Sequence, residues 1–151
     1  MSGFTTYMDI ALAEARLAAT RGETPVGAVI VNPVNGDILA QNGNRTRELS
    51  DPTAHAEILV IREACKKHNS ERLTGLDLYV TLESCPMCAM AISAARIGRL
   101  YYGAPDPKSG GIEQGPRIFS HKQCHHKPEI YGGISETESA NLLREFFEVR
   151  R

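Results

Sequence analysis

Segments with helical periodicity alternate with short apolar runs along this chain, and that alternation limits the folds open to it. The helical segments are residues 5–20, 54–68, 85–95 and the stretch after Ser135. The strand-like runs are residues 26–31, 37–40, 77–82, 100–103 and 130–131. An Asn-Gly pair between the first two runs predicts a β-hairpin. We therefore expect an α/β fold, a three-layer α/β/α sandwich whose helices cover a mixed sheet of about five strands.

The apolar spacing also predicts which helical side chains face the core. These are Met8, Leu12, Ala15 and Ala19, then Ile58, Leu59, Ile61 and Cys65, and finally Leu142, Leu143, Phe146 and Phe147. Residues 135–138 match a capping box, which predicts the start of the last helix. Residues 104–129 have no such spacing and predict a long functional loop.

Length and net charge limit the number of domains and the kinds of partner that we expect. The 151 residues predict one domain, 1–151, large enough to bury a core without help from a metal or a disulfide. The formal charge is −1, with 8 Lys/Arg against 11 Asp/Glu in residues 1–95 and 9 against 7 in residues 96–151. A polyanionic partner must therefore bind a local patch.

No apolar run approaches the ~18 residues of a membrane span, so we expect no membrane partner. No secretory signal precedes Arg16, and we expect a cytoplasmic protein. In that reducing compartment, four cysteines indicate thiol or metal chemistry before disulfides.

Two motifs stand at predicted helix starts: His-Ala-Glu at residues 55–57 and Cys-Pro-Met-Cys at residues 85–88. Two thiolates and one neutral imidazole form a tetrahedral zinc site with an open fourth position, as catalytic zinc requires. A water bound there would lie beside Glu57, whose carboxylate can take and return its proton. These residues therefore predict a hydrolytic zinc centre formed by His55, Cys85 and Cys88.

Other interpretations remain open at this point. The C-x-x-C pair alone fits a redox site or buried small residues, and a closed structural site could take its fourth ligand from the loop. The loop candidates are His121, Cys124, His125 and His126. For that cluster we favour a solvated loop with a few buried polar groups, and for Cys65 a plain core position.

With these motifs the chain resembles the zinc-dependent cytidine and nucleoside deaminases, and among them the bacterial tRNA adenosine deaminases. The resemblance covers nearly the whole chain. It is carried by residues 24–28, 43–45, 51–57, 78–88, 96–99, 103–108, 146–147 and 150–151.

The resemblance implies a role for each matching residue. His55, Cys85 and Cys88 would bind one Zn²⁺, and Glu57 would be the catalytic proton shuttle. The substrate-binding residues would be Val26, Asn44, Ala56, Ser84 and Asp106. The RNA-binding residues would be Lys108, Phe146, Phe147, Arg150 and Arg151. Ser84 departs from the family, which usually has proline before the first cysteine.

The expected reaction is hydrolytic deamination of adenosine to inosine at the tRNA wobble position, with release of ammonia. The implied partners are a tRNA anticodon stem-loop and a second copy of the chain in a homodimer. An unpaired loop base suits such an enzyme, because its extrusion breaks no base pair. The rival enzyme is a deaminase of free cytosine, guanine or nucleosides, and the rival outside enzymes is a zinc-stabilised binding module.

Overall fold

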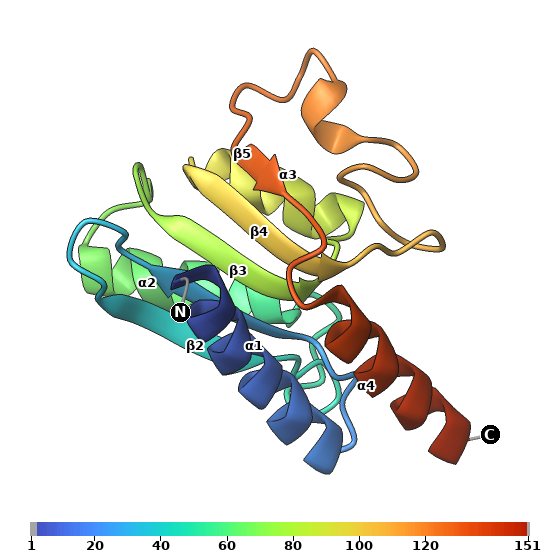
Figure 1. Cartoon of the computed structure of the whole chain (residues 1–151). Helices are drawn as coiled ribbons and strands as arrows, with labels where there is room; N and C mark the ends of the chain where they lie inside the picture. Colours follow the sequence, from blue (N-terminus) through green and yellow to red (C-terminus); the bar gives the residue numbers. More distant parts are fainter. Residues whose placement is uncertain (1–2, 151) are drawn as a thin grey trace.

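The computed structural model describes residues 3–150, which form a five-stranded sheet with helices on both faces (Figure 1). The strand order is β2-β1-β3-β4-β5. β1 is antiparallel to β2 and β3, whereas β3, β4 and β5 are mutually parallel, so the sheet is mixed as expected. The strands are β1 (Gly27–Val31), β2 (Ile38–Gly43), β3 (Asp77–Leu82), β4 (Arg99–Ala104) and β5 (Glu129–Tyr131).

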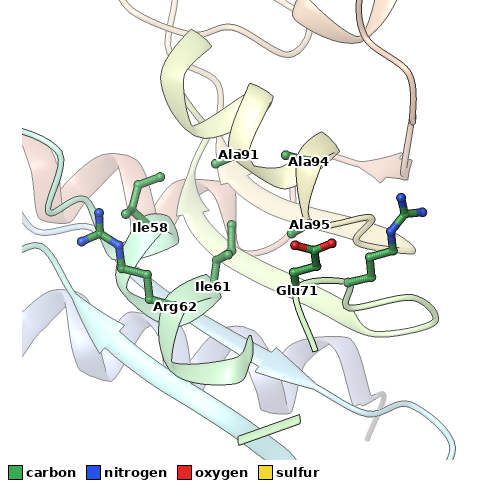
Figure 2. A pocket seen from close by; sticks show the side chains of 8 residues that line it. Ile58, Ile61, Arg62, Glu71, Ala91, Ala94 and Ala95 are labelled. Carbon is green, nitrogen blue, oxygen red and sulfur yellow. The ribbon is translucent and has the colours of Figure 1, made fainter. Parts of the chain in front are cut away.

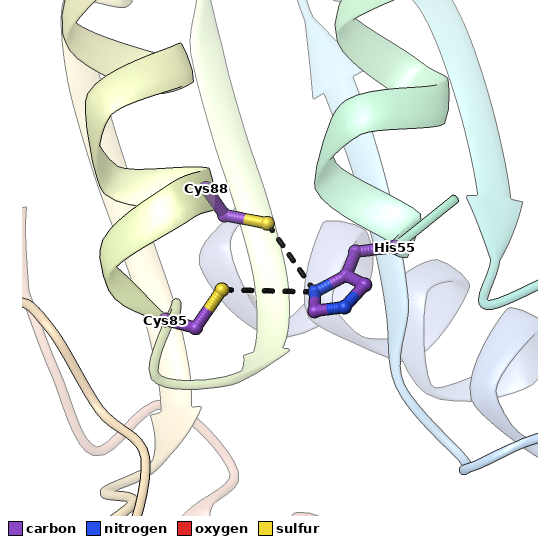
Figure 3. Close-up of side chains that lie close together, drawn as sticks. All are labelled: His55, Cys85 and Cys88. Atoms are coloured by element: carbon purple, nitrogen blue, oxygen red, sulfur yellow. Dashed lines mark hydrogen bonds between the residues drawn. The ribbon is translucent and has the colours of Figure 1, made fainter. Parts of the chain in front are cut away.

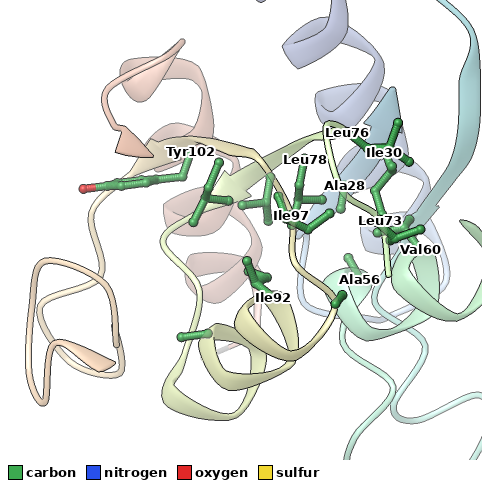
Figure 4. Close-up of a cluster of buried hydrophobic side chains, with 14 of the residues drawn as sticks. Ala28, Ile30, Ala56, Val60, Leu73, Leu76, Leu78, Ile92, Ile97 and Tyr102 are labelled. Carbon is green, nitrogen blue, oxygen red and sulfur yellow. The ribbon is translucent and has the colours of Figure 1, made fainter. Parts of the chain in front are cut away.

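Two apolar layers separate the sheet from its helices, which confirms the three-layer α/β/α sandwich. The helices are α1 (Gly3–Thr20), α2 (Ala56–His68), α3 (Pro86–Ala94) and α4 (Glu136–Val149). α1 and α4 pack on one face, where Met8 and Leu12 meet Val29 and Tyr101. α2 and α3 pack on the other face over a larger cluster that includes Val60, Leu78 and Ile92 (Figure 4).

The β1–β2 hairpin is confirmed, and its first strand lies unusually close to α1. A Cβ at Gly27 would stand 1.9 Å from the Ala11 carbonyl oxygen and 2.6 Å from the Ala15 backbone nitrogen. Only glycine allows this approach. The strand that begins at Gly27 is thereby fixed against the first helix, immediately after Val26.

Four details of the helices differ from prediction. In α2 the buried residues include Ala56, Val60 and Ala64, while the predicted core residues are only partly buried, because alanines let the helix lie closer to the sheet. In α1, Ala18 rather than Ala19 is fully buried.

The other two differences concern α4, which packs mainly on β4. Phe147 is 51% exposed instead of facing the core, because α4 has fewer contacts with β3 and α1 than with β4. Ser135 adopts a left-handed backbone with φ 57° and makes no side-chain cap, so the capping-box prediction was wrong although the helix starts where expected.

Residues 105–128 form the predicted long loop, interrupted by one short 3-10 turn, Ile118–Ser120. Within residues 3–150, no helix is long and apolar enough to cross a membrane.

Candidate metal centre

α2 and α3 begin side by side at one edge of the sheet, and their first residues bring the two motifs together (Figure 3). His55 is the N-cap residue of α2, Cys85 is the N-cap residue of α3, and Cys88 lies in the first turn of α3. Pro86 occupies the first turn of α3, where its missing N–H costs nothing. The helix starts therefore present one imidazole and two thiols to the same point.

The distances among these atoms fit a tetrahedral zinc ion. His55 Nδ1 lies 3.7 Å from Cys85 Sγ and 3.5 Å from Cys88 Sγ, and all three ligand atoms lie within 4.8 Å of one another. With Zn–S bonds of about 2.3 Å and Zn–N bonds of about 2.1 Å, tetrahedral geometry places sulfur and nitrogen about 3.6 Å apart. The donor set and its spacing thus suit Zn²⁺.

The local electrostatics favour an anionic sulfur. A hydrogen bond from the Cys88 thiol, followed by one from His55, lowers the pKa of Cys85 to about 4. The free N–H groups of the α3 N-terminus act in the same direction. In return, the sulfur of Cys85 raises the pKa of His55. These groups favour the thiolate form of Cys85, which is the form that binds a cation.

Glu57 lies beside this group. It sits in the first turn of α2 and is 3% exposed, and burial raises the pKa of its carboxyl group. The extended backbone of His55, with φ −70° and ψ 153°, lets the histidine and the glutamate approach one site although they are two residues apart.

A cavity of about 240 Å³ opens over these residues, and we call it the central cavity. It is lined by Thr24, Val26, Asn44, Thr46, His55, Glu57, Leu82, Glu83, Cys85, Asp106 and Ser109. Such a space beside a buried carboxylate and a metal ligand set can hold one small planar ligand and a water.

The structure brings most of the predicted site residues to this cavity. Val26, Asn44 and Asp106 line it, whereas Ala56 and Ser84 are buried beside it. The Ala56 N–H donates to Asn44 Oδ1 at 2.8 Å, so the polar group that Asn44 can offer a ligand is its amide nitrogen. Ser84 is 1% exposed, and a hydrogen bond from its hydroxyl lowers the pKa of the Glu57 carboxyl group against the effect of burial.

Sequence reasoning missed five lining residues, namely Thr24, Thr46, Leu82, Glu83 and Ser109. Glu83 carries a signal in retrospect, because a carboxylate next to a buried strand and a cysteine motif needs a partner. The others lie in loops, in turns or at a strand end, where no periodicity marks them.

The closed structural site finds no support in residues 3–150, where His55, Cys85 and Cys88 form the only group suited to a metal. The loop cluster has other contacts. Cys124 Sγ lies 3.2 Å from Ser93 Oγ, His126 Nε2 lies 2.6 Å from the Ile97 carbonyl oxygen, and His121 Nε2 lies 2.6 Å from the Pro116 carbonyl oxygen. Cys124 and His126 thereby attach the long loop to α3 and the segment that follows it.

The residues predicted to contact RNA divide into two sets. Lys108 and Phe147 line a second cavity of about 360 Å³, the side cavity, which shares Thr24, Leu82, Asp106 and Ser109 with the central one. Phe146 is buried beneath the Arg150 guanidinium, whose carbon lies 3.5 Å from the ring centroid. Arg151 lies outside the described residues.

Comparisons with known proteins agree with this chemistry. The model of the family described as "Cytidine and deoxycytidylate deaminase zinc-binding region" matches residues 1–104. The tRNA-specific adenosine deaminase of Agrobacterium fabrum is 58% identical over 151 residues, which is 100% of this chain and 98% of that protein. The tRNA-specific adenosine deaminase of Bacillus subtilis is 41% identical over 145 residues, covering 96% of this chain and 89% of that protein.

Solved structures give the same picture. One from a study of A-to-I editing by tRNA:A34 deaminases at the wobble position has a TM-score of 0.89 at 60% identity, covering 92% of this chain and 99% of its own. A guanine deaminase from Nitrosomonas europaea has a TM-score of 0.84 at 19% identity, covering 97% of this chain and 85% of its own. The second likeness concerns the fold alone.

Proposed function

Because the chain belongs to the tRNA-specific adenosine deaminases, within the zinc-binding cytidine and deoxycytidylate deaminase family, we propose that it converts adenosine to inosine at the tRNA wobble position. The observation that carries this proposal is a zinc-type ligand set that shares one cavity with a buried glutamate. Water is consumed and ammonia is released. The proposed place of action is the cytoplasm.

The candidate zinc ligands, Glu57 and Asn44 each have a task in this reaction. A zinc ion held by His55, Cys85 and Cys88 would lower the pKa of a water bound to it. Glu57 accepts a proton from the attacking water and gives it to ring nitrogen N1 as carbon C6 becomes tetrahedral. It then carries the proton of the new C6 hydroxyl group to the exocyclic nitrogen, which leaves as ammonia while the C6 carbonyl group of inosine forms. Asn44 orients the nucleoside through its amide nitrogen.

The shape of the site favours a base that belongs to a polynucleotide. A free-base deaminase needs a closed pocket around a small substrate, whereas here four residues line both the central and the side cavity. The target base would enter the central cavity, and a neighbouring nucleotide would lie in the side cavity. Phe147 offers it an exposed ring, and Lys108 offers a phosphate contact.

We also propose that two copies associate through the groove between α2 and α3 (Figure 2). This groove has a volume of about 480 Å³ and an apolar floor that includes Ile58, Ile61 and Ala91. Arg62, Glu71 and Arg72 line it as well, so Glu71 of each copy can pair with an arginine of its two-fold partner. Because both helices begin at the metal ligands, the groove adjoins the site.

Two measurements test these proposals. Purified protein is incubated with tRNA and, separately, with free adenosine, guanine and cytosine, and inosine is mapped in the tRNA while ammonia is measured. Inosine at the first anticodon position supports the proposal, and ammonia from free bases alone contradicts it. Light scattering of the native protein and of Ile61→Asp tests the dimer. We expect the native protein to have the mass of a dimer and Ile61→Asp to have half that mass.

A further inference from the structure

Glu83 is a buried carboxylate that the reaction above does not use. It follows β3 directly and is 2% exposed. Among residues 3–150 no ion pair includes it. Instead it accepts four backbone N–H bonds. Oε1 accepts from Asp106 at 2.9 Å, and Oε2 accepts from Ile112 at 3.1 Å, Glu113 at 2.8 Å and Gln114 at 2.9 Å. A buried charge is satisfied here entirely by one loop.

The four donors stand at the two ends of one segment, residues 106–114, which has no helix or strand of its own. The segment lies directly on the carboxylate, because a Cβ at Gly110 would stand 2.7 Å from Glu83 Cδ. Beyond it, the Gly111 N–H donates to the Ser84 carbonyl oxygen at 2.8 Å, next to Cys85. The Glu83 carboxylate and the Ser84 carbonyl oxygen thus both hold the segment against the candidate metal ligands.

This segment forms one wall of the central cavity through Asp106 and Ser109. Asp106 Oδ1 accepts the N–H groups of Lys108 at 3.1 Å and Ser109 at 3.0 Å, which makes the turn stiff. We propose that Glu83 is a positioning residue: its carboxylate holds the 106–114 segment over the metal centre and so fixes the wall that receives the substrate.

Glu83→Gln tests this with the smallest change of shape. A carboxylate only accepts hydrogen bonds, whereas an amide has one accepting oxygen and one donating nitrogen. In the variant, an NH₂ group must face either the Asp106 N–H or the three donors at 112–114. We expect backbone amide exchange in residues 105–114 to become about tenfold faster or more, with exchange in β1 and β3 unchanged.

The kinetic readout rests on the proposed deaminase function, whereas amide exchange does not. We expect Glu83→Gln to keep one zinc per chain and to raise KM about tenfold while kcat changes less than about threefold, because the wall binds substrate and the ligands lie on α2 and α3. The matched control is Asp77→Asn, a buried carboxylate at the opposite end of β3 that pairs with Arg99 at 3.0 Å. It should leave both KM and exchange at 105–114 unchanged.

If Glu83→Gln does not fold, Gly110→Ala is the variant that tests the proposal. Its methyl group meets the same carboxylate and the Asp106 carbonyl oxygen from the loop side and leaves β3 intact, and the same rise in exchange and KM is expected. The proposal is overturned if either folded variant exchanges at 105–114 like the native protein, or if Asp77→Asn raises KM equally. If the native protein edits no tRNA, the exchange result alone decides the role of Glu83.

Discussion

The backbone of a single residue, His55, makes the site possible. Two residues apart within a helix, side chains point to nearly opposite sides. His55 lies before the first turn with an extended backbone, and Glu57 lies inside it, so both reach the central cavity. The His-x-Glu spacing is therefore useful only at a helix start.

Glu57→Gln tests the role of the carboxylate. The amide keeps the volume and the buried position but cannot carry a proton, so we expect turnover to fall by about 10²-fold or more. Zinc content and melting temperature should stay near native values. Glu63→Gln, exposed on the same helix, is the matched control and should keep full activity. A zinc-loaded Glu57→Gln protein with native turnover would refute the assignment.

Glu23 makes a pH-dependent contribution to the stability of the loop that carries the cavity residue Thr46. Its carboxylate accepts N–H bonds from Glu48 at 2.8 Å and Arg47 at 3.2 Å, next to the cavity residue Thr46. Burial raises its pKa, but these hydrogen bonds outweigh burial and hold the pKa below the ordinary 4.5.

A lowered pKa in the folded state means that ionised Glu23 stabilises the fold above about pH 4.5, and that this stabilisation is lost as the pH falls through the lower value. We expect Glu23→Gln to have a lower urea midpoint than the native protein at pH 7 and a smaller deficit at pH 3. A deficit that does not change with pH would contradict this assignment.

At the scale of elements, sequence patterns predicted the features that depend on local residue chemistry. The strand over 77–82, the hairpin and the helix starts at both motifs all followed from residue type and spacing. The buried faces of α2 and α4 did not, because they depend on how closely each helix approaches the sheet. Ile58 and Phe147 have apolar side chains at helical spacing, yet they face a groove and solvent.

The same distinction between local chemistry and tertiary packing separates the site residues that could be predicted from those that could not. The candidate ligands and Glu57 could be predicted from motifs, because metal chemistry fixes residue type and spacing. The 106–114 wall could not be derived this way, since a loop held by backbone N–H bonds to Glu83 leaves no periodic pattern. Asp106 was predicted only through family resemblance.

Gly27→Ala tests the contact between α1 and β1. The new methyl group would overlap the Ala11 carbonyl, so α1 must move, and we expect a loss of about 1–3 kcal/mol or more in the free energy of unfolding. Gly98→Ala is the control, because its Cβ meets no atom closer than 3.4 Å. Equal denaturation midpoints for the two variants would show that the close approach is not required.

At the scale of the whole molecule, a formal charge of −1 leaves RNA binding to local groups. Lys108 lines the side cavity with the exposed Phe147, and Arg150 lies over the Phe146 ring at the end of α4. Tight binding by a nearly neutral protein therefore requires phosphate contacts that are few and well placed.

We expect tRNA affinity to fall as salt rises, and Lys108→Gln to reduce the slope of log K against log salt by about 0.7, the value for one phosphate contact to a single strand. Lys66→Gln, exposed at the far end of α2, is the comparison variant and should leave the slope unchanged. A native slope near zero would contradict phosphate contacts of any kind.

The central claim is a catalytic zinc ion with three protein ligands and one position left for water. X-ray absorption at the zinc edge of the purified protein tests it most directly. We predict one zinc per chain with two sulfurs at about 2.3 Å and a nitrogen and an oxygen at about 2.0–2.1 Å. A third sulfur or a second imidazole in the zinc shell would show a closed structural site and contradict the account.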